Sequence, residues 1–231
     1  MGGCGKPPSS PDISAREITL RAGDGVELSA TLYVPAEGGL RPGLTLLHRE
    51  GADRQSWQAF AERACRGGYL VLLPDLRGHG RSGPSSGWRS FTSTDWTNMP
   101  SDIGVLQQAL IQHGADSRNL AVGGEGVGAS LALLHAGQSA NVQAVVMLSP
   151  GLDYHGLNLE EVLARHKDLP VLLLAAENDA YAASSAYALK ASAAGFCELR
   201  AYPGAAHGTD LLAASPNASA QILEWLHAIL K

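Results

Sequence analysis

The chain has 231 residues and a mass of 24.1 kDa, a size that favours a single domain. Hydrophobic residues make up 45% of it and charged residues 17%, which excludes a largely disordered chain. The formal net charge of −5 argues against nucleic acid as a partner, because phosphate binding needs a basic surface. No stretch reaches the roughly 18 consecutive apolar residues of a membrane-spanning helix, so no spanning segment is predicted.

The first 14 residues are predicted to form a flexible tether, because a polar, proline-rich run follows the glycine-rich segment around Cys4. Small residues before Cys4 resemble the junction of a bacterial lipoprotein, where a lipidated cysteine precedes such a tether. No charged and apolar signal region precedes Cys4 in the given sequence. Two interpretations stay open: a cell-envelope protein with a lipid anchor at Cys4, if a signal peptide lies upstream, or a cytoplasmic protein with an exposed tail cysteine.

After the tether, short apolar runs alternate with amphipathic stretches to the end of the chain. Eight strands are predicted, at residues 17–21, 26–34, 43–48, 69–73, 120–123, 142–148, 171–176 and 198–202. Five helices are predicted, at residues 54–66, 101–113, 127–138, 182–194 and 217–230. The first two strands form a hairpin, and the alternation that follows predicts a mostly parallel eight-stranded sheet with helices on both faces. Residues 15–231 are therefore expected to form one α/β domain.

In sheets of this kind, functional sites form at the carboxyl ends of the strands. The loop after the eighth predicted strand carries His207, and the loop after the seventh carries Glu177 and Asp179. A carboxylate from the neighbouring strand can orient an imidazole and stabilise its charged form. The two loops therefore predict an acid–base pair.

The order of the elements and these loops resemble the α/β-hydrolase superfamily, particularly its small members that are dienelactone-hydrolase-like or esterase-like. Two further motifs match, LLHREG at residues 46–51 and PDLRGHGRS at residues 74–82. The resemblance extends over residues 15–231. It implies an α/β-hydrolase fold, Asp179 as the acid of a catalytic triad and His207 as its base. It also implies a small ester, thioester or lactone as substrate, and no cofactor or metal.

The family places a nucleophile in a Gly-x-Ser-x-Gly turn between the fifth strand and the next helix. This chain has GEGVG at residues 124–128, so Gly126 stands in the nucleophile's position and leaves it vacant. A register shifted by one would place Glu125 at the apex as a carboxylate nucleophile, but Val127 would then stand where the turn needs glycine. The three glycines favour Gly126 at the apex.

The same stretch also matches the dinucleotide-binding pattern, as Gly124-x-Gly126-x-x-Ala129. It follows the fifth strand rather than the first, and residues 144–149 lack the acidic residue expected about 20 positions later. Both features disfavour a dinucleotide site.

By the same resemblance, the oxyanion hole would use the backbone N–H of Val127 and one from residues 48–50, which we assign to Glu50. Arg49 stands where relatives often carry glycine. Residues 150–169 are too few to build a large helical cap between the sixth and seventh strands. Trp88, Phe91 and Trp96 are expected either to roof the pocket or to pack over the sheet edge.

A triad without its nucleophile loses about a factor of 10⁶ in turnover. Three interpretations stay open: a non-catalytic protein that binds a ligand, a serine enzyme that carries an inactivating substitution, or direct activation of water by His207. The partner is a small-molecule acyl substrate or ligand in each case.

Overall fold

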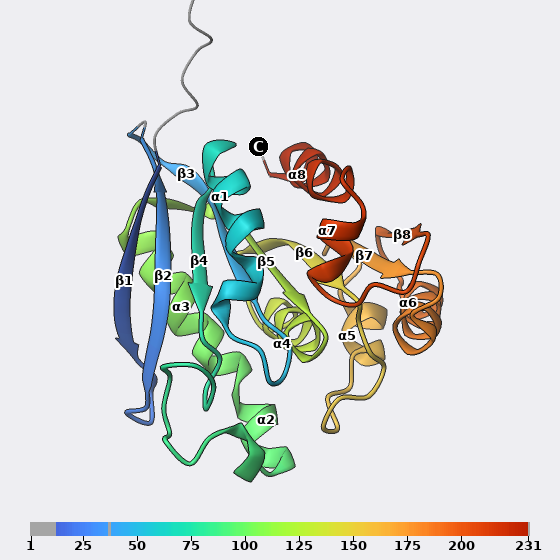
Figure 1. Ribbon diagram of the computed structural model, residues 1–231, viewed down its shortest axis with the longest axis horizontal. Helices are drawn as coiled ribbons and strands as arrows, with labels where there is room; N and C mark the ends of the chain where they lie inside the picture. Colours follow the sequence, from blue (N-terminus) through green and yellow to red (C-terminus); the bar gives the residue numbers. More distant parts are fainter. Residues whose placement is uncertain (1–12, 37, 231) are drawn as a thin grey trace, which may run out of the picture.

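The computed structural model describes residues 13–36 and 38–230 (Figure 1). Residues 1–12 lie outside the described part, and with them Cys4 and most of the predicted tether. The first strand begins at Ile13, so the strand includes the last two residues of the range 1–14 that was expected to be a tether.

The centre of the molecule is one eight-stranded sheet in the order β1-β2-β4-β3-β5-β6-β7-β8. The hairpin β1–β2 and the pair β2–β4 are antiparallel, and every other pair is parallel. This confirms the predicted fold class. The strands are β1 (Ile13–Arg21), β2 (Glu27–Pro35), β3 (Arg41–Leu47), β4 (Leu70–Pro74), β5 (Ala115–Glu125), β6 (Val142–Leu148), β7 (Val171–Ala176) and β8 (Cys197–Tyr202).

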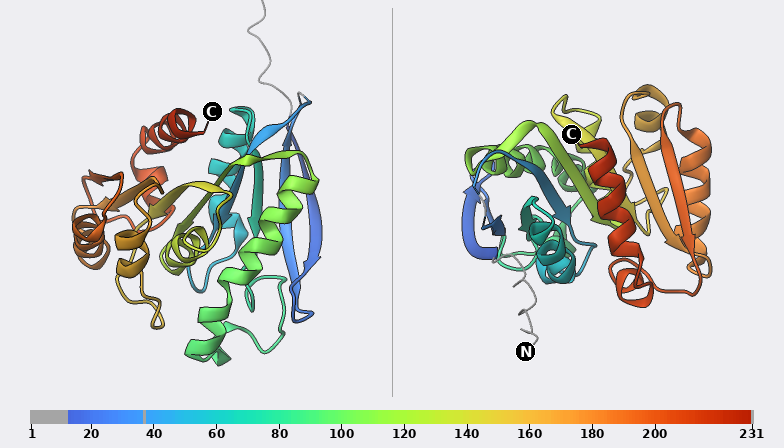
Figure 2. Two further views of the ribbon diagram at one scale, coloured as in Figure 1. Left: turned by 180° about the vertical axis from the view of Figure 1, so that it is seen from behind. Right: turned by 90° about the horizontal axis from the view of Figure 1, so that it is seen from above.

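Helices cover both faces of this sheet (Figure 2). Side chains of α1 and α8 share one buried cluster with the strands, and side chains of α3, α4 and α6 share another on the opposite face. The five predicted helices correspond to η1 (Arg54–Trp57) with α1 (Gln58–Arg66), α3 (Pro100–Gln112), α4 (Val127–Ala136), α6 (Ala180–Ser192) and α8 (Ala218–Ile229).

Four short helices were not predicted: η2 (Trp88–Ser90), α2 (Ser93–Asn98), α5 (Glu160–Arg165) and α7 (Asp210–Ala214). Each is too short to show a helical repeat of apolar residues. None of them forms a cap domain, and within the described residues no helix is long and apolar enough to cross a membrane.

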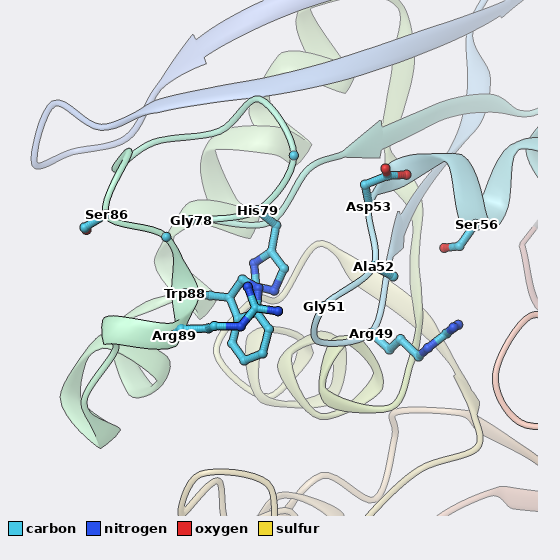
Figure 3. A pocket seen from close by; sticks show the side chains of 12 residues that line it. Arg49, Gly51, Ala52, Asp53, Ser56, Gly78, His79, Ser86, Trp88 and Arg89 are labelled. Atoms are coloured by element: carbon cyan, nitrogen blue, oxygen red, sulfur yellow. The ribbon is translucent and has the colours of Figure 1, made fainter.

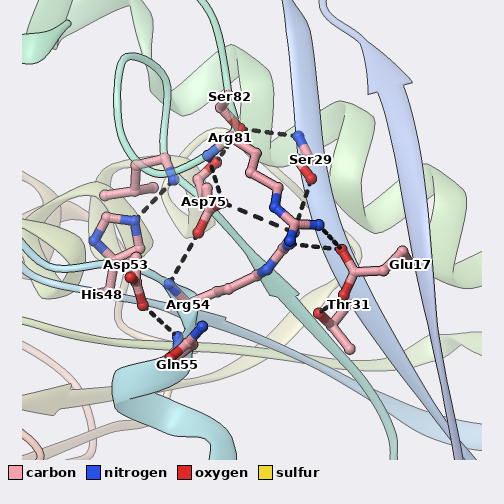
Figure 4. Close-up of polar contacts among 11 residues, drawn as sticks. Glu17, Ser29, Thr31, His48, Asp53, Arg54, Gln55, Asp75, Arg81 and Ser82 are labelled. Carbon is pink, nitrogen blue, oxygen red and sulfur yellow. Dashed lines mark hydrogen bonds and ion pairs between the residues drawn. The ribbon is translucent and has the colours of Figure 1, made fainter.

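The loop after β4 is held by a buried polar network (Figure 4). The Asp75 carboxylate accepts hydrogen bonds from the backbone N–H groups of Arg54 at 3.0 Å and Arg81 at 2.8 Å. The Arg54 guanidinium donates to Ser29 Oγ at 2.8 Å and to Glu17 Oε2 at 2.5 Å. These contacts connect β1, β2, η1 and the loop after β4 (the β4 loop). They fix the position of this loop relative to the strands.

Candidate functional site

The turn between β5 and α4 lies where the sequence placed the nucleophile turn. β5 ends at Glu125, α4 begins at Val127, and Gly126 between them has φ +54° and ψ −123°. Glycine enters this left-handed region without the steric cost that a side chain imposes. The apex of the turn is therefore Gly126, and the register that would place Glu125 there does not occur.

The glycines on either side of the apex allow three elements to approach closely. A Cβ added at Gly124 would lie 2.3 Å from the carbonyl carbon of Gly128, and one at Gly128 would lie 2.5 Å from the carbonyl oxygen of His48. Both contacts are with backbone, which cannot swing aside. The sequence GEGVG thus meets the steric demands of a sharp strand-to-helix turn pressed against the end of β3.

His207 and Asp179 meet above adjacent strand ends. Asp179 follows β7 and His207 follows β8, and the two strands pair in parallel. His207 Nδ1 lies 2.6 Å from Asp179 Oδ2, whereas the neighbouring Glu177 is exposed. A hydrogen bond from Nδ1 to the carboxylate leaves the Nε2 atom of His207 as a proton acceptor.

Glu125 has a position that the sequence did not predict. Its carboxylate is fully buried and accepts hydrogen bonds from the Ser56 hydroxyl at 2.7 Å and from the backbone N–H of Thr209 at 2.8 Å. Arg49 Nη1 lies 3.2 Å from Glu125 Oε2 and supplies the counter-charge. Both carboxylate oxygens thus join the end of β5 to three segments: the loop after β3 (residues 48–53, the β3 loop), η1 and the loop of His207.

The loop that carries His207 has a further anchor next to that residue. The backbone N–H of Gly208 donates to Ser149 Oγ at 2.9 Å, and Ser149 is fully buried with φ +46°. A Cβ at Gly208 would lie only 2.1 Å from Glu125 Oε2. Residues 207, 208 and 209 are therefore bonded to Asp179, Ser149 and Glu125, respectively. These three contacts fix the position of the loop that carries the imidazole.

The β3 loop brings Arg49 and Glu50 to the other side of the turn. Glu50 Oε2 lies 2.7 Å from His155 Nε2, and the His155 ring stacks on Trp96 at 4.2 Å between ring centroids. This contact ties the β3 loop to the β6–β7 loop. Among the described residues, the backbone N–H groups of Val127 and Glu50 have no hydrogen-bond acceptor, so both predicted oxyanion donors are unused.

His48 shapes the β3 loop without being available as a base. The backbone N–H of Leu76 donates to His48 Nε2 at 2.9 Å, and Nδ1 donates to the carbonyl oxygen of Arg49 at 2.7 Å. Burial lowers the pKa of His48 to about 4, so the ring is neutral at pH 7. The imidazole therefore bridges the β3 and β4 loops as a neutral donor and acceptor.

The three predicted aromatic residues pack on one buried cluster, and Trp88 also lines a cavity. Trp96 is buried in the core, and Phe91 and Trp88 lie half-buried against it. Trp88 stacks on His79 with ring centroids 5.3 Å apart, and the Arg89 guanidinium lies 4.6 Å from the centroid of the Trp88 ring.

A cavity of about 560 Å³ separates the β3 loop from the β4 loop (Figure 3). Its wall includes Arg49, Asp53 and Ser56 on one side and His79, Trp88 and Arg89 on the other. Gly126, Asp179 and His207 are not part of this wall, and Arg49 borders both the cavity and Gly126.

Tyr154, in the β6–β7 loop, lies close to Gly126. A Cβ built at Gly126 would lie 3.9 Å from Tyr154 Oη, and the Tyr154 ring packs edge-on against Tyr181 at 5.9 Å. Burial raises the pKa of Tyr154 to about 12, so the phenol keeps its proton.

Within the described part of the chain, no group of three or more histidine, cysteine, aspartate or glutamate residues could hold a metal ion.

Sequence reasoning therefore anticipated the residues at the strand ends and missed the groups that hold them. A carboxylate inside a run of small and apolar residues was the available signal for Glu125. Ser149 and Tyr154 carried no local signal, because their contacts join segments that are distant along the chain.

Solved structures with the same fold include several hydrolases. DcsB, determined in complex with its substrate analogue, superimposes with a TM-score of 0.82 at 14% identity, over 94% of this chain and 99% of that one. An esterase of Pyrococcus furiosus gives 0.77 at 17% identity, over 95% and 92% of the two chains. A dienelactone hydrolase of Anabaena variabilis gives 0.74 at 20% identity, over 95% and 99%. These likenesses establish the α/β-hydrolase fold across the full chain.

A sequence search of curated proteins found no match. The model of a hydrolase family described as serine aminopeptidase, S33, matches residues 41–165, which is more than half of the chain and includes the β3 loop, the β4 loop and the β5–α4 turn. By this match and by its fold, the chain belongs to that hydrolase family within the α/β-hydrolase superfamily.

Proposed function

We propose that this chain carries the framework of an acyl hydrolase for small esters, thioesters or lactones, with Gly126 in the place of the nucleophile. His207 is the general base, Asp179 orients it, and the backbone N–H groups of Val127 and Glu50 form the oxyanion hole. The observation that carries the proposal is the 2.6 Å contact between His207 and Asp179 beside a turn whose apex has no side chain.

The missing side chain closes the covalent route. In that route a nucleophile attacks the acyl carbon, the histidine takes the nucleophile's proton, and backbone N–H groups stabilise the oxyanion. Gly126 offers no atom for the attack, so no acyl-enzyme forms. Loss of a nucleophilic serine costs about a factor of 10⁶, and the rest of such a site retains roughly 10³ to 10⁴ over water. Hydrolysis by water that His207 activates is expected to fall in this residual range.

A second candidate is a non-catalytic protein that binds a small acyl ligand. The cavity of about 560 Å³ beside Arg49 favours it, because this cavity is complete without any contribution from residue 126. Its volume lies within the range of typical small-molecule pockets, roughly 300 to 1,000 Å³.

Hydrolysis of short acyl nitrophenyl esters tests the first candidate. The unmodified chain, Gly126→Ser and Gly126→Ser with His207→Ala are compared at equal concentration. We expect a background rate for the unmodified chain, a clear gain for Gly126→Ser, and loss of that gain when His207 is removed. His207-dependent turnover by the unmodified chain would show that Gly126 does not disable the site.

The second candidate is tested by isothermal titration calorimetry, in which the unmodified chain is titrated with the same esters. Saturable binding without product would favour the ligand-binding protein over the acyl hydrolase, provided that Gly126→Ser brings no gain even when Arg49 is also replaced by glycine.

A further inference from the structure

Position 126 is crowded from the side of the β3 loop. A Cβ built on Gly126 would lie 3.2 Å from Arg49 Cβ and 3.9 Å from Arg49 Cα. Favourable contacts between carbon atoms lie at about 3.5 to 4.0 Å, so a side chain at 126 would press on Arg49. The contact involves a Cβ, which moves only with its own backbone, and a change of side-chain rotamer cannot relieve it.

Arg49 is held at both ends. Its guanidinium bonds to the fully buried Glu125 carboxylate at 3.2 Å. Its carbonyl oxygen accepts hydrogen bonds from His48 Nδ1 at 2.7 Å and from the backbone N–H of Ala52 at 3.2 Å. Withdrawal of Arg49 from residue 126 would disturb these bonds, so the β3 loop resists the shift that a side chain at 126 demands.

The Arg49 side chain also extends toward the base. Its Cβ borders the apex at Gly126, whereas Nη1 would lie 3.5 Å from a Cβ placed on Gly208, the residue after His207. The side chain of Arg49 therefore extends from Gly126, the proposed nucleophile position, to the loop that carries His207, the proposed general base.

We infer that Arg49 and Gly126 are a complementary pair, in which Arg49 takes the room that a nucleophile's Cβ would need. The inference rests on the proposed function, because it takes residue 126 as the nucleophile position. Its consequence is that the missing nucleophile involves two residues. Gly126→Ser alone restores a hydroxyl but places the serine in a compressed turn, and the hydroxyl is fully aligned only when position 49 is also glycine.

A set of five variants tests the pair. Gly126→Ser is made alone, with Arg49→Ala and with Arg49→Gly, and Arg49→Ala and Arg49→Gly are each made alone. Arg49→Ala is the matched control, because it removes the guanidinium and leaves Glu125 unpaired as Arg49→Gly does, but keeps the Cβ at the contact. The variants are compared by thermal unfolding, by ester hydrolysis and by labelling with a fluorophosphonate.

In the labelling reaction the hydroxyl oxygen introduced by Gly126→Ser bonds to phosphorus, fluoride leaves, and the hydroxyl proton passes to His207. We expect Gly126→Ser with Arg49→Gly to be labelled about tenfold faster than Gly126→Ser with Arg49→Ala, because small displacements of a reacting atom carry rate penalties of this size. We also expect Gly126→Ser to lower the melting temperature less in the Arg49→Gly background than in the Arg49→Ala background.

Equal labelling and equal loss of melting temperature with alanine and glycine at position 49 would overturn the inference. Fast labelling that depends on glycine at 49, with no ester hydrolysed, would support the pair while the proposed substrate class fails. Ester hydrolysis by all three serine variants at one rate would support the proposed function while the pair fails.

Discussion

The carboxylate of Glu125 accepts a hydrogen bond of 2.8 Å from the backbone N–H of Thr209, which joins the residue before Gly126 to the loop that carries His207. The two residues are 84 positions apart along the chain. One side chain thus joins the β5–α4 turn to the loop of His207, and the same carboxylate also holds Arg49.

Glu125→Ala is expected to destabilise the fold by about 2 kcal/mol, because it leaves the N–H of Thr209 without an acceptor. The Arg49 side chain is 38% exposed, so solvent screens the charge that Glu125→Ala leaves without a partner. The loss of this ion pair therefore adds little to the cost in stability. Glu125→Gln keeps an oxygen acceptor and should cost less. Urea unfolding measures both, and equal stability of Glu125→Ala and the unmodified chain would contradict the role of Glu125.

Gly126→Ala is expected to cost more stability than Gly25→Ala. Both glycines have positive φ, +54° and +89°, so both substitutions incur backbone strain of about 1–3 kcal/mol. A Cβ at Gly25 meets no heavy atom within 4 Å, whereas one at Gly126 meets Arg49 Cβ at 3.2 Å. Thermal unfolding of the two variants compares strain alone with strain plus contact, and an equal loss would show that the contact is harmless.

Gly128→Ala is expected to cost about 3 kcal/mol or more, or to prevent folding, because its Cβ would overlap the backbone of β3. Gly104→Ala is the matched control: Gly104 lies inside α3, and the nearest atom to its Cβ is His135 Cε1 at 3.7 Å. Alanine there should stabilise the protein by about 0.5–1 kcal/mol through helix propensity. Soluble yield and unfolding midpoint measure both, and a tolerated Gly128→Ala would refute the close approach.

Stability is expected to fall as the pH is lowered from about 6.5 to 4. The pKa of His48 is about 4 in the folded protein, below its ordinary value of 6.5, so the unfolded chain binds more protons over this range. The shift corresponds to roughly 3 kcal/mol. Burial lowers the pKa values of His79 and His135 in the same direction. His48→Gln should make the pH dependence shallower in urea unfolding, and an unchanged slope would show that His48 is not its source.

The strands and long helices could be predicted because their signals are local. β7 is an uninterrupted apolar run and β6 is apolar except for Gln143, and the structure places both at the predicted bounds. β5 is longer than predicted, because residues 116–119 are polar and, of residues 115–119, only Ala115 pairs with β3, across a register shift. The helices α2, α5 and α7 are of one or two turns, too short for a periodic pattern.

The candidate site was predictable to the extent that it follows from topology. Strand ends that are adjacent in a parallel sheet bring Asp179 and His207 together, and chain order alone indicates which loops to compare. The pairing of Arg49 with Gly126 does not follow from any local pattern. It depends on the close packing of the β3 loop against the β5–α4 turn, which only the folded backbone defines.

Helix α4 is buried along its length, with only Leu134 partly exposed, and it begins directly after Gly126. Amide hydrogens in such a helix exchange with solvent only when a large part of the molecule opens. Gly126 is therefore expected to adjoin a slowly exchanging helix, and a ligand that reaches Gly126 meets a preformed surface. Evolutionary gain or loss of a nucleophile here is therefore expected to change side chains while the backbone stays in place.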